Sequence, residues 1–244
     1  MAEKKKKKII SADTGAEVEA GSRKKTKMKE AAPVGNAGGL RGGAVALWLV
    51  ALALEFLAVM IFTGKVNWTF MPSMYQLIGA LVLDLVFVII GAQLWKKANR
   101  IKPASEKNKF TFWLWNNMGV IVCTIAFLPI IILMLTNKDL DKKTKTIAVV
   151  VAIIAALIGG VCSYDFNPVS VEQQQAAISV LGDESVFWSP FGKVYHTHDD
   201  CQSLNQSDTL TYGTVEQAIA ANRTRLCSFC AKRDDITGVV TDDK

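Results

Sequence analysis

The sequence contains few of the residues that form disulfides or ligate metals: two histidines and five cysteines among 244 residues. Cys123 and Cys162 lie in apolar runs, where cysteine usually behaves as a small hydrophobic side chain. The other three, Cys201, Cys227 and Cys230, cannot all pair with one another. These numbers argue against a disulfide framework and favour a set of metal ligands.

The sequence also lacks an internal repeat and a signal-peptidase site after its first apolar run, so we do not expect a cleaved signal peptide. Half of its residues are hydrophobic, which is too apolar for an ordinary soluble protein. Charge is unevenly distributed: residues 1–42 carry 11 Lys/Arg against 5 acids, residues 43–162 carry 11 against 5, and residues 163–244 carry 6 against 12. This division predicts a basic tail, a membrane domain and an acidic C-terminal domain.

Residues 1–42 hold two basic clusters, Lys4–Lys8 and Arg23–Lys27, followed by a run rich in glycine and alanine. Because no hydrophobic periodicity is present, we predict a disordered basic tail. The tail is either simply solvated or held at anionic lipid, where each Lys or Arg contributes about 1 kcal/mol.

Four apolar segments follow the tail, each close to the ~20 residues that a spanning helix needs. They predict an α-helical integral membrane protein with four transmembrane helices in residues 43–162, near 43–63, 74–95, 111–135 and 146–162.

The distribution of Lys and Arg in the loops predicts the orientation. The tail is basic, the loop 64–73 has only Lys65, and the loop 96–110 has six Lys/Arg, which together favour a cytoplasmic N-terminus in the cell membrane. Four crossings then place the C-terminal domain in the cytoplasm as well. The loop 136–145 carries four lysines and fits that topology poorly, so three crossings with one re-entrant segment, which would export the C-terminal domain, stay open.

Two acids interrupt the apolar segments, Glu55 in the first and Asp84 in the second. An acid at the centre of a membrane helix costs about 2.5–3.5 kcal/mol on insertion scales, so both should face protein or water. At 1.5 Å per residue both lie at a similar depth on neighbouring helices. They are interpreted either as a protonated pair that links two helices or as a site for a proton or ion.

The fourth segment carries Ala148, Ala152, Ala156 and Gly160 at four-residue spacing. Small residues in a row allow helices to approach closely. We expect this stripe to pack within the chain, with a homo-oligomer face as the alternative. Residues 163–184 then form a linker with a short helix near 171–181.

Residues 185–233 have the pattern of a small α+β module, before an acidic tail at 234–244. The segments 186–188 and 193–195 flank a turn and predict a β-hairpin. Thr214 and Gln217 form a capping box that opens a short helix.

Within this module His196, Cys201, Cys227 and Cys230 have the spacing of a structural zinc site closed by a Cys-x-x-Cys knuckle. His198 is the substitute for His196. A domain of this size buries little core, and such domains often fold around a metal. No βαβ pattern surrounds the Cys-x-x-Cys pair, which argues against a thioredoxin-like redox site.

The residues Gly192–His196, Cys201–Leu204, Gly213-Thr214 with Ala218, and Cys227–Cys230 resemble small bacterial modules with the same order of motifs. The module is also distantly similar to the zinc domain of Ada-type DNA repair proteins. That resemblance implies the fold and the zinc ion. It does not imply methyl transfer, because His196 stands where that family has its reactive cysteine.

These patterns predict a non-enzymatic membrane protein that displays a zinc-stabilised binding module to a protein partner. Trp188, Phe191 and Phe229 either form the surface that contacts the partner or pack in the small core of the module. Nucleic acid is not an expected partner, since the module is acidic. One alternative is a small ion- or proton-coupled transporter that uses Glu55 and Asp84 and is regulated by the module. A weaker alternative is a thiol-based redox or metal sensor.

Overall fold

The computed structural model describes residues 7–18, 35–138, 142–182 and 184–241, and it divides the chain into two compact units. One unit is helical and comprises residues 37–98 and 109–166. The other comprises the described residues of 1–36, 99–108 and 167–244. We call them the helix bundle and the module.

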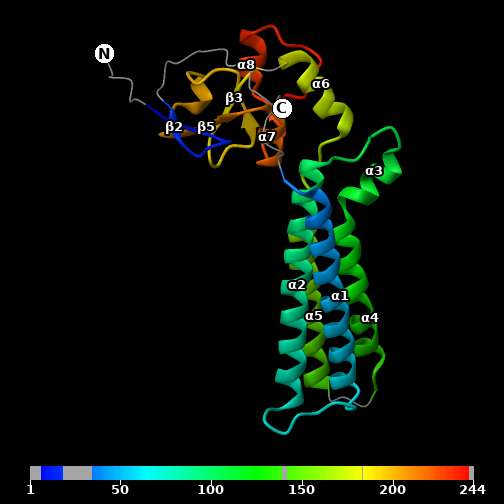
Figure 1. The fold of residues 1–244 in the computed structure, drawn as a ribbon. Coiled ribbons are helices and arrows are strands. Elements are labelled where there is room, and N and C mark those ends of the chain that lie inside the picture. The colour runs from blue at the N-terminus through cyan, green and yellow to red at the C-terminus, as the bar shows by residue number, and fades with distance from the viewer. Residues whose placement is uncertain (1–6, 19–34, 139–141, 183, 242–244) are drawn as a thin grey trace. The chain divides into compact units, whose positions relative to one another are not determined.

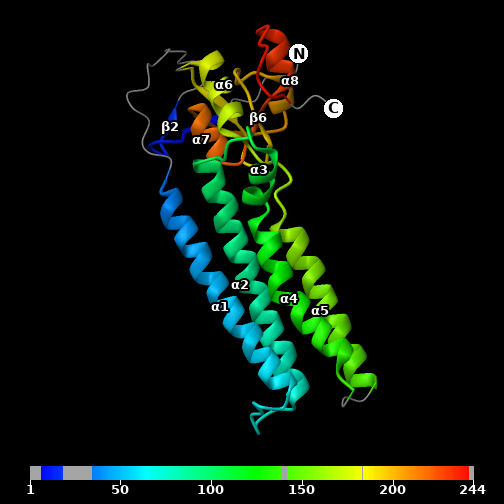
Figure 2. The same cartoon turned by 90° about the vertical axis from the view of Figure 1, so that its right-hand side faces the viewer.

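The bundle contains four helices that are long and apolar enough to cross a membrane, as predicted. They run alongside one another in both views of the ribbon (Figures 1 and 2). Their bounds are α1 (Ala37–Phe62), α2 (Ser73–Ile101), α4 (Met118–Thr136) and α5 (Lys142–Ser163). Both α1 and α2 extend beyond the predicted apolar segments, because helical backbone continues into the polar flanks.

The third predicted segment, 111–135, is not one helix. It is divided at Asn117 into α3 (Lys109–Asn116) and α4. The side chain of Asn117 donates a hydrogen bond to the carbonyl of Trp113, and that of Asn116 donates to the carbonyl of Phe112. Asparagine side chains compete for backbone carbonyls in this way, which explains why an apolar run ends one helix and begins another here.

Small side chains line the surfaces through which the long helices pack. In α1 the buried positions recur every three or four residues: Ala44, Trp48, Ala51, Glu55 and Ala58. In α5 the first two members of the predicted stripe, Ala148 and Ala152, are buried within the chain, in one hydrophobic cluster with residues of α1, α2 and α4. This burial favours intramolecular packing for that part of the stripe.

The module is built on a four-stranded sheet in the order β2-β1-β5-β3, and its first two strands correct the predicted disorder of residues 1–42. The four strands are β1 (Lys8–Ser11), β2 (Glu17–Val18), β5 (Thr209–Gly213) and β3 (Val186–Trp188). β1 pairs in parallel with β5, and Ile9 is buried in the core of the module. β1 has only four residues, which is too few for a periodic hydrophobic signal, and the lysines around it have the composition of a basic tail. Residues 1–6 and 19–34 of the predicted tail lie outside the described residues.

The predicted hairpin is present only as one antiparallel bridge between Phe187 and His196. β3 pairs instead with β5, and β4 (Val194–Tyr195) pairs in parallel with β6 (Arg225–Leu226). Both strands therefore find partners distant in sequence, which the local turn signal between them could not reveal.

Three short helices complete the module: α6 (Val171–Leu181), α7 (Val215–Ala220) and α8 (Ser228–Arg233). The predicted capping box of Thr214 and Gln217 is present at α7. The predicted acidic tail belongs to the fold as far as Thr241. Ile236 and Val239 pack against the core, and the carbonyl of Val240 accepts a hydrogen bond from Leu226.

Candidate metal centre

The strands β4 and β6 bring two of the predicted ligands together. Their parallel register pairs Tyr195 with Leu226, so the next residues, His196 and Cys227, emerge side by side. The backbone N–H of Cys227 donates to the carbonyl of Tyr195 over 2.9 Å. The backbone of His196 exchanges two hydrogen bonds of 2.7 Å with Phe187, which fixes the position of this ligand.

The other two ligands come from short helical turns. Cys201 immediately precedes the 3-10 turn η1 (Gln202–Leu204), and Cys230 lies in the first turn of α8, which follows Cys227. The backbone N–H of Ser203 donates to the sulfur of Cys201. The N–H groups of Phe229 and Cys230 donate to the sulfur of Cys227. Such bonds stabilise a thiolate, the form in which cysteine binds a metal.

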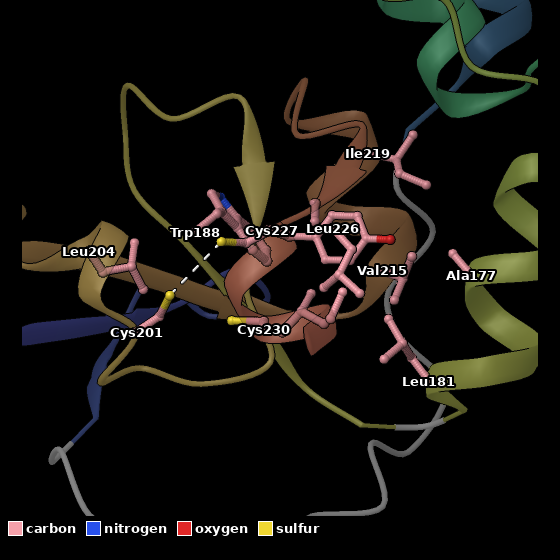
Figure 3. Packing of buried hydrophobic residues seen from close by; sticks show 14 of the residues in the cluster. Ala177, Leu181, Trp188, Cys201, Leu204, Val215, Ile219, Leu226, Cys227 and Cys230 are labelled. Carbon is pink, nitrogen blue, oxygen red and sulfur yellow. Dashed lines mark hydrogen bonds between the residues drawn. The ribbon is translucent and has the colours of Figure 1, made fainter. Parts of the chain in front are cut away.

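Two of the six separations between the candidate ligand atoms are close to those expected around a single tetrahedral ion. All four atoms lie within 4.8 Å of one another. Cys201 Sγ is 3.9 Å from Cys227 Sγ, and Cys230 Sγ is 3.8 Å from His196 Nδ1. Bonds of about 2.3 Å to sulfur and about 2.0 Å to nitrogen, at tetrahedral angles, require a sulfur–sulfur separation of about 3.8 Å and a sulfur–nitrogen separation of about 3.5 Å. Figure 3 shows the three sulfurs directed toward a common point.

The environment of the cluster suits a bound cation. All four side chains are buried, and burial raises the pKa of the Cys201 and Cys227 thiols. Converging thiolates in an apolar core would repel one another and lack solvation, whereas a bound metal deprotonates thiols and compensates their charge. The sulfur–sulfur distance also exceeds the ~2.05 Å of a disulfide. The cluster could therefore hold a metal ion.

His198 is not part of this cluster. Its Nε2 lies 2.6 Å from Asp234 Oδ1, and Thr197 Oγ1 donates to Asp234 Oδ2 over 2.5 Å. Burial raises the pKa of Asp234, but the hydrogen bonds from His198 and Thr197 outweigh it, and the net pKa of this carboxyl lies below its usual range. The geometry thus favours His196 over His198 as the ligand.

Asp234 is the residue near the cluster that sequence reasoning missed. It ties the loop after His196 to the end of α8, and an ion pair of 2.8 Å between Arg233 and Asp200 joins the same two segments. In the sequence Asp234 is one of four acids in the predicted acidic tail, and no local signal distinguishes it from the others.

The three aromatic residues proposed as a partner surface do not behave alike. Trp188 is buried in the core of the module, whereas Phe191 is 98% exposed and Phe229 is 52% exposed. Arg223 Nη2 donates to the carbonyls of Ser189 and Pro190, which fixes the turn that carries Phe191.

In the bundle the two acids that interrupt the apolar segments, Glu55 and Asp84, are both buried, so they face protein as predicted. Glu55 lies on the packing stripe of α1, and Asp84 lies on that of α2. Their charges are close enough to interact. Neither carboxylate oxygen of Asp84 has a hydrogen-bond partner among the described residues.

No family model matches the chain, and no curated protein or solved structure matches it significantly.

Proposed function

We propose that this chain is a multi-pass membrane protein that displays a zinc-stabilised binding module and has no enzymatic activity. The observation that supports the proposal is the convergence of four buried side chains, His196, Cys201, Cys227 and Cys230, whose ligand atoms lie within 4.8 Å of one another. A set of three thiolates and one imidazole is typical of structural zinc. Four protein ligands leave no open position for water or substrate, which supports a structural role for the ion.

Burial of the four ligands supports a structural ion over a thiol-based sensor. Redox-sensing cysteines are solvent-accessible and have a low pKa. Here all three cysteines are buried, and burial raises the pKa of Cys201 and Cys227. From the resemblance to Ada-type repair modules this proposal takes the fold and the zinc ion only. It excludes methyl transfer, because His196 cannot accept a methyl group as a thiolate does.

The composition of the module supports four crossings over three. The module combines residues that precede α1, residues that connect α2 to α3 and residues that follow α5. One folded unit cannot lie on both sides of a bilayer. An even number of spans must therefore separate these three segments from one another, and four spans satisfy that condition.

The positive-inside rule then favours a cytoplasmic module in the cell membrane. Six Lys/Arg of the loop 96–110 and the basic N-terminal region flank spans on the module's side. The four lysines of the loop 136–145 oppose this assignment, but they are fewer than those on the module's side.

The exposed face of the module supports a protein as its partner. Phe191 is an isolated large apolar side chain at the tip of a fixed turn, and such rigid aromatic anchors are typical of binding hot spots. Residues 163–244, which include most of the module, carry 12 acids against 6 Lys/Arg, which opposes binding to nucleic acid.

The orientation is tested by thiol labelling of two variants that place cysteine at exposed positions, Thr69→Cys in the loop between α1 and α2 and Gln206→Cys in the module. A membrane-impermeant maleimide should label Thr69→Cys in intact cells and should label Gln206→Cys only after the membrane is opened. The unmodified chain gives the background from its native cysteines. Labelling of Gln206→Cys in intact cells would refute the cytoplasmic module.

A further inference from the structure

The helix bundle contains a buried acidic pair that the proposed binding function does not use. Glu55 lies on the buried stripe of α1 between Ala51 and Ala58, and Asp84 lies on that of α2 between Leu81 and Val88. Each is at least seven residues from either end of its helix, which corresponds to about 10 Å along the axis. The two acids are therefore enclosed by the packed interior of the bundle.

Among the described residues, no cation lies in the helical segments that surround this pair. The segments 43–95, 118–136 and 146–163 contain no Lys, Arg or His apart from Lys65, which lies in the loop between α1 and α2. α4 contributes the thiol of Cys123, which interacts electrostatically with Asp84, and residues 146–161 of α5 contain no acid or base. The sulfur of Cys123 lies 3.6 Å from the carbonyl of Ala156. The ionisable groups around Asp84 are thus Glu55 and this thiol.

The Asp84 side chain is fully buried, and both of its carboxylate oxygens lack a hydrogen-bond partner among the described residues. An ionised carboxylate in such an environment is strongly destabilised, and two neighbouring carboxylates destabilise each other further. A bound proton would remove both the desolvation cost and the repulsion, and it needs less space than any other cation. The packing beside Cys123 is close, because a methyl group added at Gly159 would lie 2.7 Å from the sulfur of Cys123.

Further unpartnered polar atoms lie toward the end of the bundle at which α5 ends. Ser163 Oγ and Asn117 Oδ1 are buried without a hydrogen-bond partner among the described residues. Ser163 and Gly119 are neighbours, and Gly119 is one helical turn from Cys123. Buried polar groups in such a series can exchange protons through ordered water.

From these contacts we propose that Glu55 and Asp84 form a proton-binding site inside the helix bundle, which exchanges its proton with solvent at the end that carries Ser163. This site is independent of the zinc proposal, because it involves no residue of the module. The pair takes up this proton from solvent and can return it to solvent.

The test is infrared difference spectroscopy on the full chain in lipid nanodiscs, between about pH 5 and about pH 9. We expect a carbonyl band from a protonated carboxylic acid at neutral pH, a decrease of that band at high pH, and a shift of the band when the sample is exchanged into D₂O. Asp84→Asn should remove the band, and Glu55→Gln should move the pH at which it titrates. The matched control, Glu216→Gln, removes an acid of the module and should change neither.

Three results would overturn the proposal. The first is the absence of a protonated band in the unmodified chain at neutral pH. The second is a band that neither Asp84→Asn nor Glu55→Gln alters. The third is a band that stays constant with pH and does not exchange in D₂O, because a proton fixed as a link between two helices would behave in that way. Measurements on the unmodified chain decide the first and third outcomes even where a variant fails to fold.

Discussion

In the helix bundle, the long helices of 19 to 29 residues pack through alanine and glycine; in the module, strands of two to five residues and short helices surround four converging side chains that could hold a metal ion. Each long helix satisfies its own backbone hydrogen bonds and gains its stability from length and apolar surface. Elements as short as β4 and β6 are not stable alone. The module therefore depends on a few specific contacts, whereas the bundle distributes its stability over many.

The largest predicted effect is that of removing one ligand. Structural zinc contributes on the order of 10 kcal/mol to the folding of small domains. We expect Cys227→Ser to lose the metal and unfold the module while the bundle stays helical. Zinc content and limited proteolysis measure the first two effects, and circular dichroism in detergent measures the third.

The matched control for this ligand change is Cys162→Ser, which alters a cysteine at the end of α5 outside the cluster. It should retain the full zinc content. Equal zinc content in Cys227→Ser and Cys162→Ser would remove the distinction between the two regions.

A smaller effect is predicted for the strand from the N-terminal region. Ile9 is buried in the core of the module, whereas its neighbour Ile10 is only partly buried. Truncating a buried isoleucine to alanine costs about 2–5 kcal/mol. Ile9→Ala should therefore lower the free energy of unfolding of the zinc-loaded module by about this amount, measured by denaturant titration. Ile10→Ala, the matched control, should cost distinctly less, and equal losses would contradict the pairing of β1 with β5.

Next in size is the contact between His198 and Asp234. Their side chains are partly exposed, so we expect a coupling free energy of about 1 kcal/mol or less. A double-mutant cycle with His198→Ala and Asp234→Ala measures it from the unfolding of the module. Both variants should keep one zinc ion. Loss of zinc in His198→Ala would instead assign His198 as the ligand.

The smallest effect on stability is predicted at Phe191. Because its side chain is 98% exposed, Phe191→Ala should change the free energy of unfolding by no more than about 0.5 kcal/mol. The same variant should reduce cross-linking of the module to its protein partner in membranes. Trp188→Ala, in the core, provides the contrast, since it should destabilise the module by about 3–5 kcal/mol. A large destabilisation by Phe191→Ala would show that this ring packs against the protein.

The sequence predicted the helices of the bundle better than the strand pairing of the module. Apolar length alone located the four long helices, because each of them satisfies its own backbone. The division at Asn117 was not predicted, because it depends on hydrogen bonds from asparagine side chains to backbone carbonyls, which hydropathy does not reveal.

In the module the ligands were identified by their spacing, but the strand partners were not. β1 pairs with β5 across about 200 residues, and β4 pairs with β6 across about 30. No local pattern encodes such pairings. For the same reason the contacts of Asp234 were not predicted, because its partners lie 36 and 37 residues away in the sequence.

The central claim is that the four converging side chains bind one structural zinc ion. X-ray absorption at the zinc edge, with metal quantification on the purified full chain, tests it most directly. The account predicts one zinc per chain, with three sulfur neighbours at about 2.3 Å and one nitrogen neighbour at about 2.0 Å. A chain that folds its module without metal, or a zinc ion surrounded only by oxygen and nitrogen, would contradict it.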